Sequence, residues 1–215
     1  MAAVTRGPAG TPQRDEAVST PASVSAGFAD PGPLGLAAFA ATTFFLSTVN
    51  AGLLPKSVEA GVFGLAFFYG GLAQLLAGMW EFVKGNTFGA LAFSSYGAFW
   101  LSFWYLASHA SSDLGKASAG DVDKALGTYL LVWTIFTAYM FIASLRTSGA
   151  ITAVFLLLAL TFLFLCLGEY NASSGLTKVG GWLGLATALV AWYASFAGVF
   201  NSTAKRDVVP TFPRT

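Results

Sequence analysis

Six apolar runs, each about as long as a bilayer is thick, dominate the hydrophobic pattern of this chain. A hydrocarbon core of about 30 Å takes roughly 20 apolar residues in a helix, and each run comes close to that length. Together the runs contain a single acidic or basic residue, Glu81. Because charges are costly in lipid, this pattern predicts six transmembrane helices. They are expected at 34–54, 61–83, 88–108, 125–145, 150–168 and 179–204.

The composition of the chain agrees with a membrane protein. Of its 215 residues, 55% are hydrophobic and 10% are charged, and the mean hydropathy is +0.66. These values differ strongly from those of an ordinary soluble domain. The net charge of +1 points to no nucleic acid or other charged partner. The single cysteine, Cys166, excludes an internal disulfide and a cysteine metal cluster.

The sequence predicts a disordered cytoplasmic tail at 1–28, a six-helix transmembrane domain at 29–204 and a second cytoplasmic tail at 205–215. Its first 26 residues are rich in Ala, Pro, Ser and Thr and lack the apolar block of a secretory signal peptide. With both termini in the cytoplasm, seven Lys and Arg residues lie inside and four outside, which favours this orientation. The predicted fold class is an all-α membrane protein in the cell membrane.

Little in the chain points to catalysis. An intramembrane hydrolase needs a nucleophile with a base, or a metal site built from His and carboxylates. The single histidine, His109, stands at the end of the third run beside a polar connection, which suits an interfacial residue. We therefore expect no enzyme activity, no cofactor and no metal. A six-helix bundle with scattered polar residues instead suggests the passage of a small solute.

The stretch ADPGPLGLAAF, residues 29–39, opens the first apolar run with an acid, two prolines and two glycines. Pro31 and Pro33 hold the chain out of regular helix before the run, and Pro33 suits the first helical turn. The expected result is a helix start with free N–H groups and a partial positive charge, which attracts a carboxylate. The alternative is an ordinary capped N-terminus, with Asp30 or the turn itself as the cap.

Several segments together resemble the acetate uptake transporter family, the succinate-acetate permeases. DPGPLGL, at 30–36, resembles the NPAPLGL signature of that family. The other segments, in the family's order, are FYGGLAQLLAGMWEF at 68–82, GNTFGALAFSSYGAFWLS at 85–102 and GGWLGLATALVAWYASFAG at 180–198. The resemblance covers residues 30–202. It implies six helices around a pore in each protomer, assembly as a homo-hexamer, and passage of acetate and related monocarboxylates, in some members also succinate.

The resemblance also implies roles for individual residues. It implies a hydrophobic constriction at Phe39, Tyr96 and Leu160, although Tyr96 alone also fits a core position and Leu160 a lipid-facing or core one. Two departures from the signature are Asp30 for Asn and Gly32 for Ala. An ionised Asp30 either caps the helix or repels an arriving carboxylate. The signature implies an anion-binding element at the inner vestibule made of Asp30, Pro31, Gly32, Pro33, Leu34, Gly35 and Leu36.

The first run presents one helix face of mixed apolar and polar character. Its members follow i, i+4, i+7, i+11 spacing and are Phe39, Thr43, Leu46 and Asn50. We expect this face to line the pore, with Thr43 and Asn50 as polar contacts for the solute.

The second run contains two polar residues, Gln74 and Glu81, which share a helix face. Gln74 is either a ligand for the solute or an interhelical hydrogen-bonding residue. Glu81 either carries a proton in coupled uptake or pairs with Lys84 one turn on.

The combined prediction is membrane transport of acetate or a related small carboxylate, by an anion channel or a proton-coupled mechanism. Two alternatives remain. One is a pore for a neutral small solute such as urea, because nothing in the sequence fixes a permanent positive charge in the pathway. The other is a non-transporting membrane scaffold or sensor whose oligomer is its function. The expected partners are the solute, the bilayer and further copies of the chain.

Overall fold

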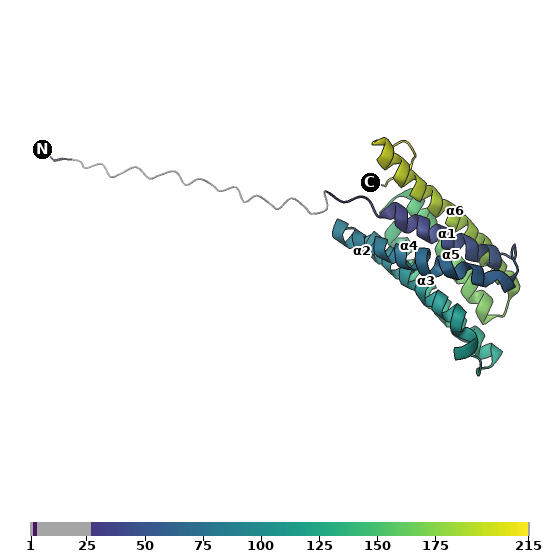
Figure 1. Ribbon diagram of the computed structural model, residues 1–215. Coiled ribbons are helices and arrows are strands. Elements are labelled where there is room, and N and C mark those ends of the chain that lie inside the picture. The colour runs from purple at the N-terminus through teal and green to yellow at the C-terminus, as the bar shows by residue number, and fades with distance from the viewer. Residues whose placement is uncertain (1, 4–26, 215) are drawn as a thin grey trace.

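The computed structural model describes residues 2–3 and 27–214, except for the side chains of residues 110–113. This part of the chain is a helical bundle without a β-strand (Figure 1). Most of the predicted N-terminal tail lies outside the described residues. The helices are α1 (Gly32–Asn50), η2 (Lys56–Val62), η3 (Leu65–Ala73), α2 (Gln74–Lys84), α3 (Thr87–Asp113), α4 (Ala119–Ser144), α5 (Gly149–Tyr170) and α6 (Ser174–Ala204).

Five of the six predicted runs each overlap one of these helices, and the run at 61–83 overlaps η2, η3 and α2. Four of the described helices, α1, α4, α5 and α6, are long and apolar enough to cross a membrane. A fifth span results if η2 and the segment formed by η3 and α2 are counted together. These two parts are bent by 42° at the break between them. The 27 residues of α3 include many Ser and aromatic residues, which lower its hydropathy. Length and composition of the described helices therefore account for four or five spans.

Close helix contacts hold the bundle together. The helices pack α1 against α6, α6 against α5, α5 against α4, and α2 against α3. A Cβ on Gly181 of α6 would collide with the backbone of Asn50 and Ala51 at the end of α1. A Cβ on Gly97 of α3 would lie 2.7 Å from the backbone N of Leu75 in α2. Glycine permits these approaches, which matter because lipid supplies no hydrophobic force between helices.

An aromatic core joins most of the helices. Its rings meet mostly edge to face or tilted, for example Phe99 of α3 and Phe162 of α5, whose centroids lie 5.2 Å apart. Trp100, near the middle of α3, is 2% exposed and belongs to this core. The buried members are Phe39, Ala40, Ala66, Ala92, Tyr96, Phe99, Trp100, Met140, Val154, Phe155, Leu158, Phe162 and Ala191.

The second membrane segment is irregular at both of its ends. It begins with η3, a nine-residue π-helix, a conformation with wider turns than an α-helix. Its second half, α2, ends at Gly85, which has a φ of 76°. This left-handed conformation favours glycine and stops the helix. The resulting turn brings Asn86 and the start of α3 beside the last turn of α2.

Residues 208–214, which we call the C-terminal strap, fold back from the end of α6 onto the start of α5. The Asn201 side chain holds the beginning of the strap, since its Oδ1 accepts a hydrogen bond from the N–H of Val209 at 2.8 Å. Farther along, the Phe212 carbonyl accepts one from the N–H of Gly149 at 2.7 Å. The segment predicted as a C-terminal tail is therefore bound to the bundle.

Candidate functional site: a cavity beside an aromatic cluster

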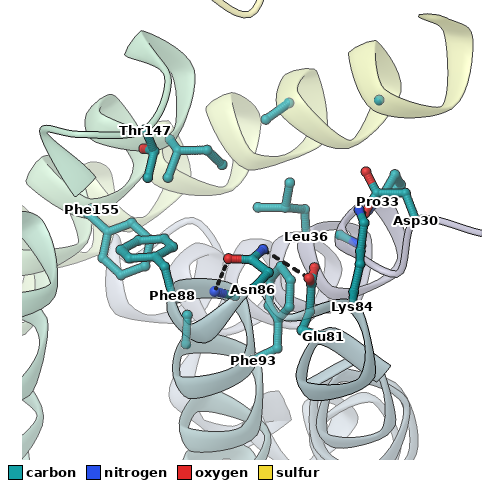
Figure 2. A pocket seen from close by; sticks show the side chains of 16 residues that line it. Asp30, Pro33, Leu36, Glu81, Lys84, Asn86, Phe88, Phe93, Thr147 and Phe155 are labelled. Atoms are coloured by element: carbon teal, nitrogen blue, oxygen red, sulfur yellow. Dashed lines mark hydrogen bonds and ion pairs between the residues drawn. The ribbon is translucent and has the colours of Figure 1, made fainter. Parts of the chain in front are cut away.

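A cavity of about 260 Å³ lies at the end of the bundle where α1, α3 and α5 begin and α2 ends. Figure 2 shows Asp30, Pro33 and Lys84 on one side of it and Thr147 and Phe155 on the other. The cavity wall includes parts of α1, α2, α3, α5 and α6. The predicted anion-binding signature thus lies at a cavity, and its neighbours come from segments far apart in the sequence.

Three helix N-termini, those of α1, α3 and α5, face the cavity with partial positive charge. Several of the N–H groups at these ends are already occupied. The N–H of Gly32 donates to Asp30 Oδ1 at 3.0 Å, and that of Gly89 donates to Asn86 Oδ1 at 3.1 Å. The strap takes the first N–H of α5. At these positions the helix ends contribute a positive electrostatic field to the cavity rather than free N–H groups. The sequence predicted free N–H groups at the start of α1, but that of Gly32 is occupied.

Lys84 is the one positively charged residue among those described around the cavity. Its Nζ lies 2.7 Å from Asp30 Oδ1, and the side chains of Lys84 and Asp30 are 33% and 52% exposed. The same Asp30 oxygen accepts from the N–H of Gly32, the first residue of α1, so Asp30 occupies that N–H and also pairs with Lys84. A Cβ on Gly32 would lie only 3.2 Å from that oxygen. The two departures from the family signature, Asp30 and Gly32, are therefore in direct contact.

Glu81 is buried beside the cavity, with 1% of its surface exposed. Asn86 Nδ2 donates to its Oε2 at 2.9 Å. Of the two alternatives for Glu81, pairing with Lys84 is not observed, because Lys84 pairs with Asp30 instead. The turn at Gly85 places Asn86 against Glu81, while the segment leading into α1 brings Asp30 to Lys84.

Phe39 of α1 and Tyr96 of α3 are buried, and their ring centroids lie 5.7 Å apart. Phe155 of α5 lines the cavity, and its centroid lies 6.1 Å from that of Tyr96. We call Phe39, Tyr96 and Phe155 the aromatic cluster. The hydroxyl groups of Tyr96 and Thr137, from α4, form a hydrogen bond of 2.9 Å. The cavity therefore ends at a layer of packed rings held by contacts from four helices.

The remaining predicted residues lie in different surroundings. Leu160 is half-buried and is not among the described residues of the buried core, whereas Leu158 is. Residues two apart point to nearly opposite sides of a helix. Thr43 is buried and Gln74 is 1% exposed, while Asn50 is half-buried at the far end of α1. The structure thus places Glu81 and part of the signature around the cavity and brings Phe39 and Tyr96 into contact. Leu160 lies outside the described buried core, and Asn50 lies at the far end of α1.

Sequence reasoning missed several residues of the site. Asn86 and Phe88 lie within the segment GNTFG, where the glycine signals a turn that could have marked them. Phe88 packs against Phe155 with ring centroids 5.1 Å apart. Phe155 and Thr137 stand in apolar runs without any local signal, so only the packing of α4 and α5 identifies them.

These features define a class of membrane protein: a helical bundle with a small charged cavity at one end and a layer of aromatic rings behind it, suited to passing small solutes. The chain belongs to the GPR1/FUN34/yaaH family, whose model matches residues 15–214. The prediction of membership in the acetate transporter family is confirmed, and the match reaches beyond the motifs at both ends.

The sequences of individual relatives align with most of this chain. It is 36% identical over 182 residues to the succinate-acetate/proton symporter SatP of Escherichia coli, covering 85% of this chain and 94% of the relative. It is 44% identical over 174 residues to the ammonia transport outward protein 2 of Saccharomyces cerevisiae, covering 80% of this chain and 62% of the relative. The chain thus spans 62% of the length of that yeast relative and 66% of the length of a second relative from the same yeast.

The fold also matches a solved structure, that of the bacterial acetate channel SatP. The TM-score is 0.79 at 35% sequence identity, and the match covers 86% of this chain and 99% of the other. The chain therefore has the SatP fold and is an integral membrane protein.

Proposed function

We propose that this protein transports acetate and related short-chain monocarboxylates across a membrane. One observation carries the proposal: a cavity of about 260 Å³, with a lysine and three helix N-termini around it, ends at a buried aromatic cluster. The positive groups attract a small anion, and the rings separate the two sides of the membrane. The names of the bacterial symporter and of the channel support acetate as the solute, and support transport rather than catalysis.

The aromatic cluster acts as the gate of the pathway. Its rings offer almost no hydrogen bonds, so a solute gives up hydration there, and the cost of this step grows steeply with charge. A small monocarboxylate is therefore favoured over a dianion such as succinate. In α5 we place Leu158 beside this gate, since it shares the buried core with Phe39 and Tyr96. Leu160 is the alternative that the family resemblance implies.

Two buried polar groups fit a solute path beyond the gate. Thr43 Oγ1, one helical turn after Phe39, and Gln74 Oε1 are both buried without a hydrogen-bond partner among the described residues. Unpaired polar groups are costly in a membrane interior, where water does not reach them. We assign both groups to contacts with water or solute in transit. Asn50, at the far end of α1, is the corresponding polar contact near the other mouth.

The proposed architecture follows the family. It has six membrane helices, with α3 and the bent η2–η3–α2 segment as full spans, and homo-hexamers with a pore in each protomer. Both termini lie in the cytoplasm of a plasma-membrane protein. The excess of basic residues on that side supports the orientation. The cavity then opens toward the cytoplasm.

Glu81 is the candidate for coupling transport to protons. It is the acidic residue of the apolar runs, it is buried, and its carboxylate lies beside the cavity. The relatives do not decide the mechanism, since one is named a proton symporter and another a channel. Loss of proton-coupled acetate flux with retained passive flux in Glu81→Gln supports the role of Glu81. Unchanged coupling in that variant excludes it.

A neutral small solute is the second candidate. Asp30 neutralises Lys84, so no free cationic side chain remains among the described residues that line the cavity. The yeast relative is named for ammonia transport. Flux of labelled urea and acetate through the same vesicles separates the candidates. Acetate flux that depends on membrane potential supports the anion, whereas urea flux without acetate flux supports the alternative.

The first experiment is uptake of labelled acetate into proteoliposomes at two external pH values. We expect uptake above that of empty vesicles, altered by Phe39→Ala and by Tyr96→Ala. Phe196→Ala is the matched control, since this phenylalanine of α6 is 55% exposed and lies outside the cluster. A folded protein that gives no uptake at either pH contradicts the proposal and favours a scaffold or a neutral-solute pore.

A further inference from the structure

We propose that Lys84 binds the carboxylate of the transported anion at the cavity, and that Asp30 is a built-in competitor for the same ammonium group. The inference rests on the proposed function and assigns its anion-binding residue. In this proposal Asp30 does not act by repelling the anion directly. It weakens anion binding by occupying Lys84.

Lys84 has the charge, the position and the exposure that this role requires. It is the cationic residue of the described cavity wall, and its side chain is one-third exposed, so a solute in the cavity reaches it. An ammonium group has three N–H donors. The structure records a single partner for it, the Asp30 carboxylate at 2.7 Å. The group already bound by Lys84 is thus chemically the same as the acetate carboxylate.

Asp30 is held where it competes, yet it is not locked there. Its Oδ1 is fixed by the N–H of Gly32 at 3.0 Å, which keeps the carboxylate at the cavity rim. Its side chain is half-exposed, and such exposed ion pairs are weak. An arriving carboxylate therefore displaces Asp30 from Lys84 at modest cost, and the pair lowers the apparent affinity of the cavity.

The other groups at the cavity give the anion few alternatives. The N–H groups of Gly32 and Gly89 are occupied by Asp30 and Asn86. Glu81 also faces this region, but it is buried and accepts its hydrogen bond from Asn86. The ammonium of Lys84 is therefore the strongest anion ligand that the described cavity offers, and its availability depends on Asp30.

Asp30→Asn is the informative substitution because it removes the charge while keeping a side-chain oxygen. The amide oxygen of Asn can still accept from the N–H of Gly32, so the start of α1 is preserved. The matched control is Asp121→Asn. Asp121 also lies at a helix start near a lysine, with Oδ1 3.8 Å from Lys124 Nζ, but it stands at the opposite end of α4 from the cavity.

The experiment measures the half-saturation concentration and maximal rate of acetate flux in proteoliposomes. Asp30→Asn is expected to lower the half-saturation concentration by about two- to fivefold, the range of an exposed ion pair, and Asp121→Asn to leave it unchanged. Lys84→Gln is expected to raise the half-saturation concentration, and Lys84→Arg to raise it less. The double variant, Asp30→Asn with Lys84→Gln, is expected to give the same value as Lys84→Gln alone. Tighter binding is not an expected result of a folding defect.

Three results would overturn the inference. The first is an unchanged or raised half-saturation concentration in Asp30→Asn. The second is an equal improvement by Asp30→Asn when Lys84 is already Gln, which would mean that Asp30 acts on the anion directly. The third is an equal improvement in Asp121→Asn. In each case the wild type still transports acetate, whereas a wild type without acetate flux overturns the proposed function itself.

Discussion

Replacing Tyr96 by Phe is expected to destabilise the wild-type protein more than it destabilises the Thr137→Val variant. The two hydroxyls lie 2.9 Å apart, and the residues are 3% and 0% exposed. Tyr96→Phe keeps the ring of the aromatic cluster and removes the side-chain partner of Thr137. Thr137→Val does the reverse. The double variant removes both hydroxyls and leaves neither unpaired.

The magnitude follows from the burial of this pair. A buried polar group left without its partner costs about 1–3 kcal/mol in proteins generally. Interhelical hydrogen bonds in membranes average about 0.6 kcal/mol and reach about 1.7 kcal/mol. We expect each single variant to lose about 1–2 kcal/mol of unfolding free energy. The double variant should lose less than the sum, by a coupling energy of about 0.6–1.7 kcal/mol.

Denaturant unfolding of the four proteins in the same detergent measures this coupling energy. The control cycle uses Tyr129→Phe and Ser102→Ala, whose hydroxyls are 2.8 Å apart across the same helix pair. Each of these hydroxyls also lies within hydrogen-bond distance of the Phe99 carbonyl, so a single variant leaves the other hydroxyl with an acceptor and the coupling should be smaller. Acetate flux through the same variants adds a second readout. If the phenol donates to acetate in transit, Tyr96→Phe lowers flux and Thr137→Val does not.

Additive losses in the Tyr96 and Thr137 cycle would refute the reasoning, because they would mean that the two hydroxyls do not stabilise one another. Coupling no larger than that of the Ser102 and Tyr129 pair would refute the cost assigned to a buried hydroxyl that is left unpaired. Equal flux in Tyr96→Phe and wild type would exclude the phenol as a ligand and leave the ring alone as the gate.

Two further predictions concern the surroundings of the cavity. A Cβ in Gly89→Ala would lie 2.8 Å from Glu81 Cδ, so we expect a loss of about 1–3 kcal/mol on denaturant unfolding. Gly64→Ala, where no atom lies within 4 Å, is its control, and an equal loss there would contradict the explanation. Asn201→Ala removes the side chain that holds the strap and should reduce hydrogen-exchange protection of the Gly149 amide. Asn171→Ala is its control, and unchanged protection in Asn201→Ala would mean that the strap holds without Asn201.

The helices and the start of the site could be predicted because local patterns determine them. The apolar runs fall on the observed helices, and α1 begins within the signature, where the prolines suggested a helix start. The contact between Phe39 and Tyr96 was expected from the family resemblance. In each case the residues that carry the information are close in sequence or belong to a recognisable motif.

The charged contacts could not be predicted in the same way. A lysine three residues after a glutamate suggests a local pair, yet Lys84 bonds to Asp30, 54 positions away. That choice depends on the turn at Gly85 and on the packing of α1 beside α2, which no local pattern encodes. The return of the strap to Gly149 likewise depends on the position of α5 relative to the end of α6.

The bonds around the cavity are distributed unevenly over the helices that form its walls. Ser195 of α6 donates to the Pro33 carbonyl of α1 at 2.7 Å, and the strap joins the chain beyond α6 to the start of α5. At this end hydrogen bonds therefore link α1, α5 and α6 to one another, whereas the ion pair of Lys84 with Asp30 connects α2 to the segment before α1. Widening of the mouth without breaking those hydrogen bonds is then a displacement of α2 and α3, which lengthens the distance between Lys84 and Asp30.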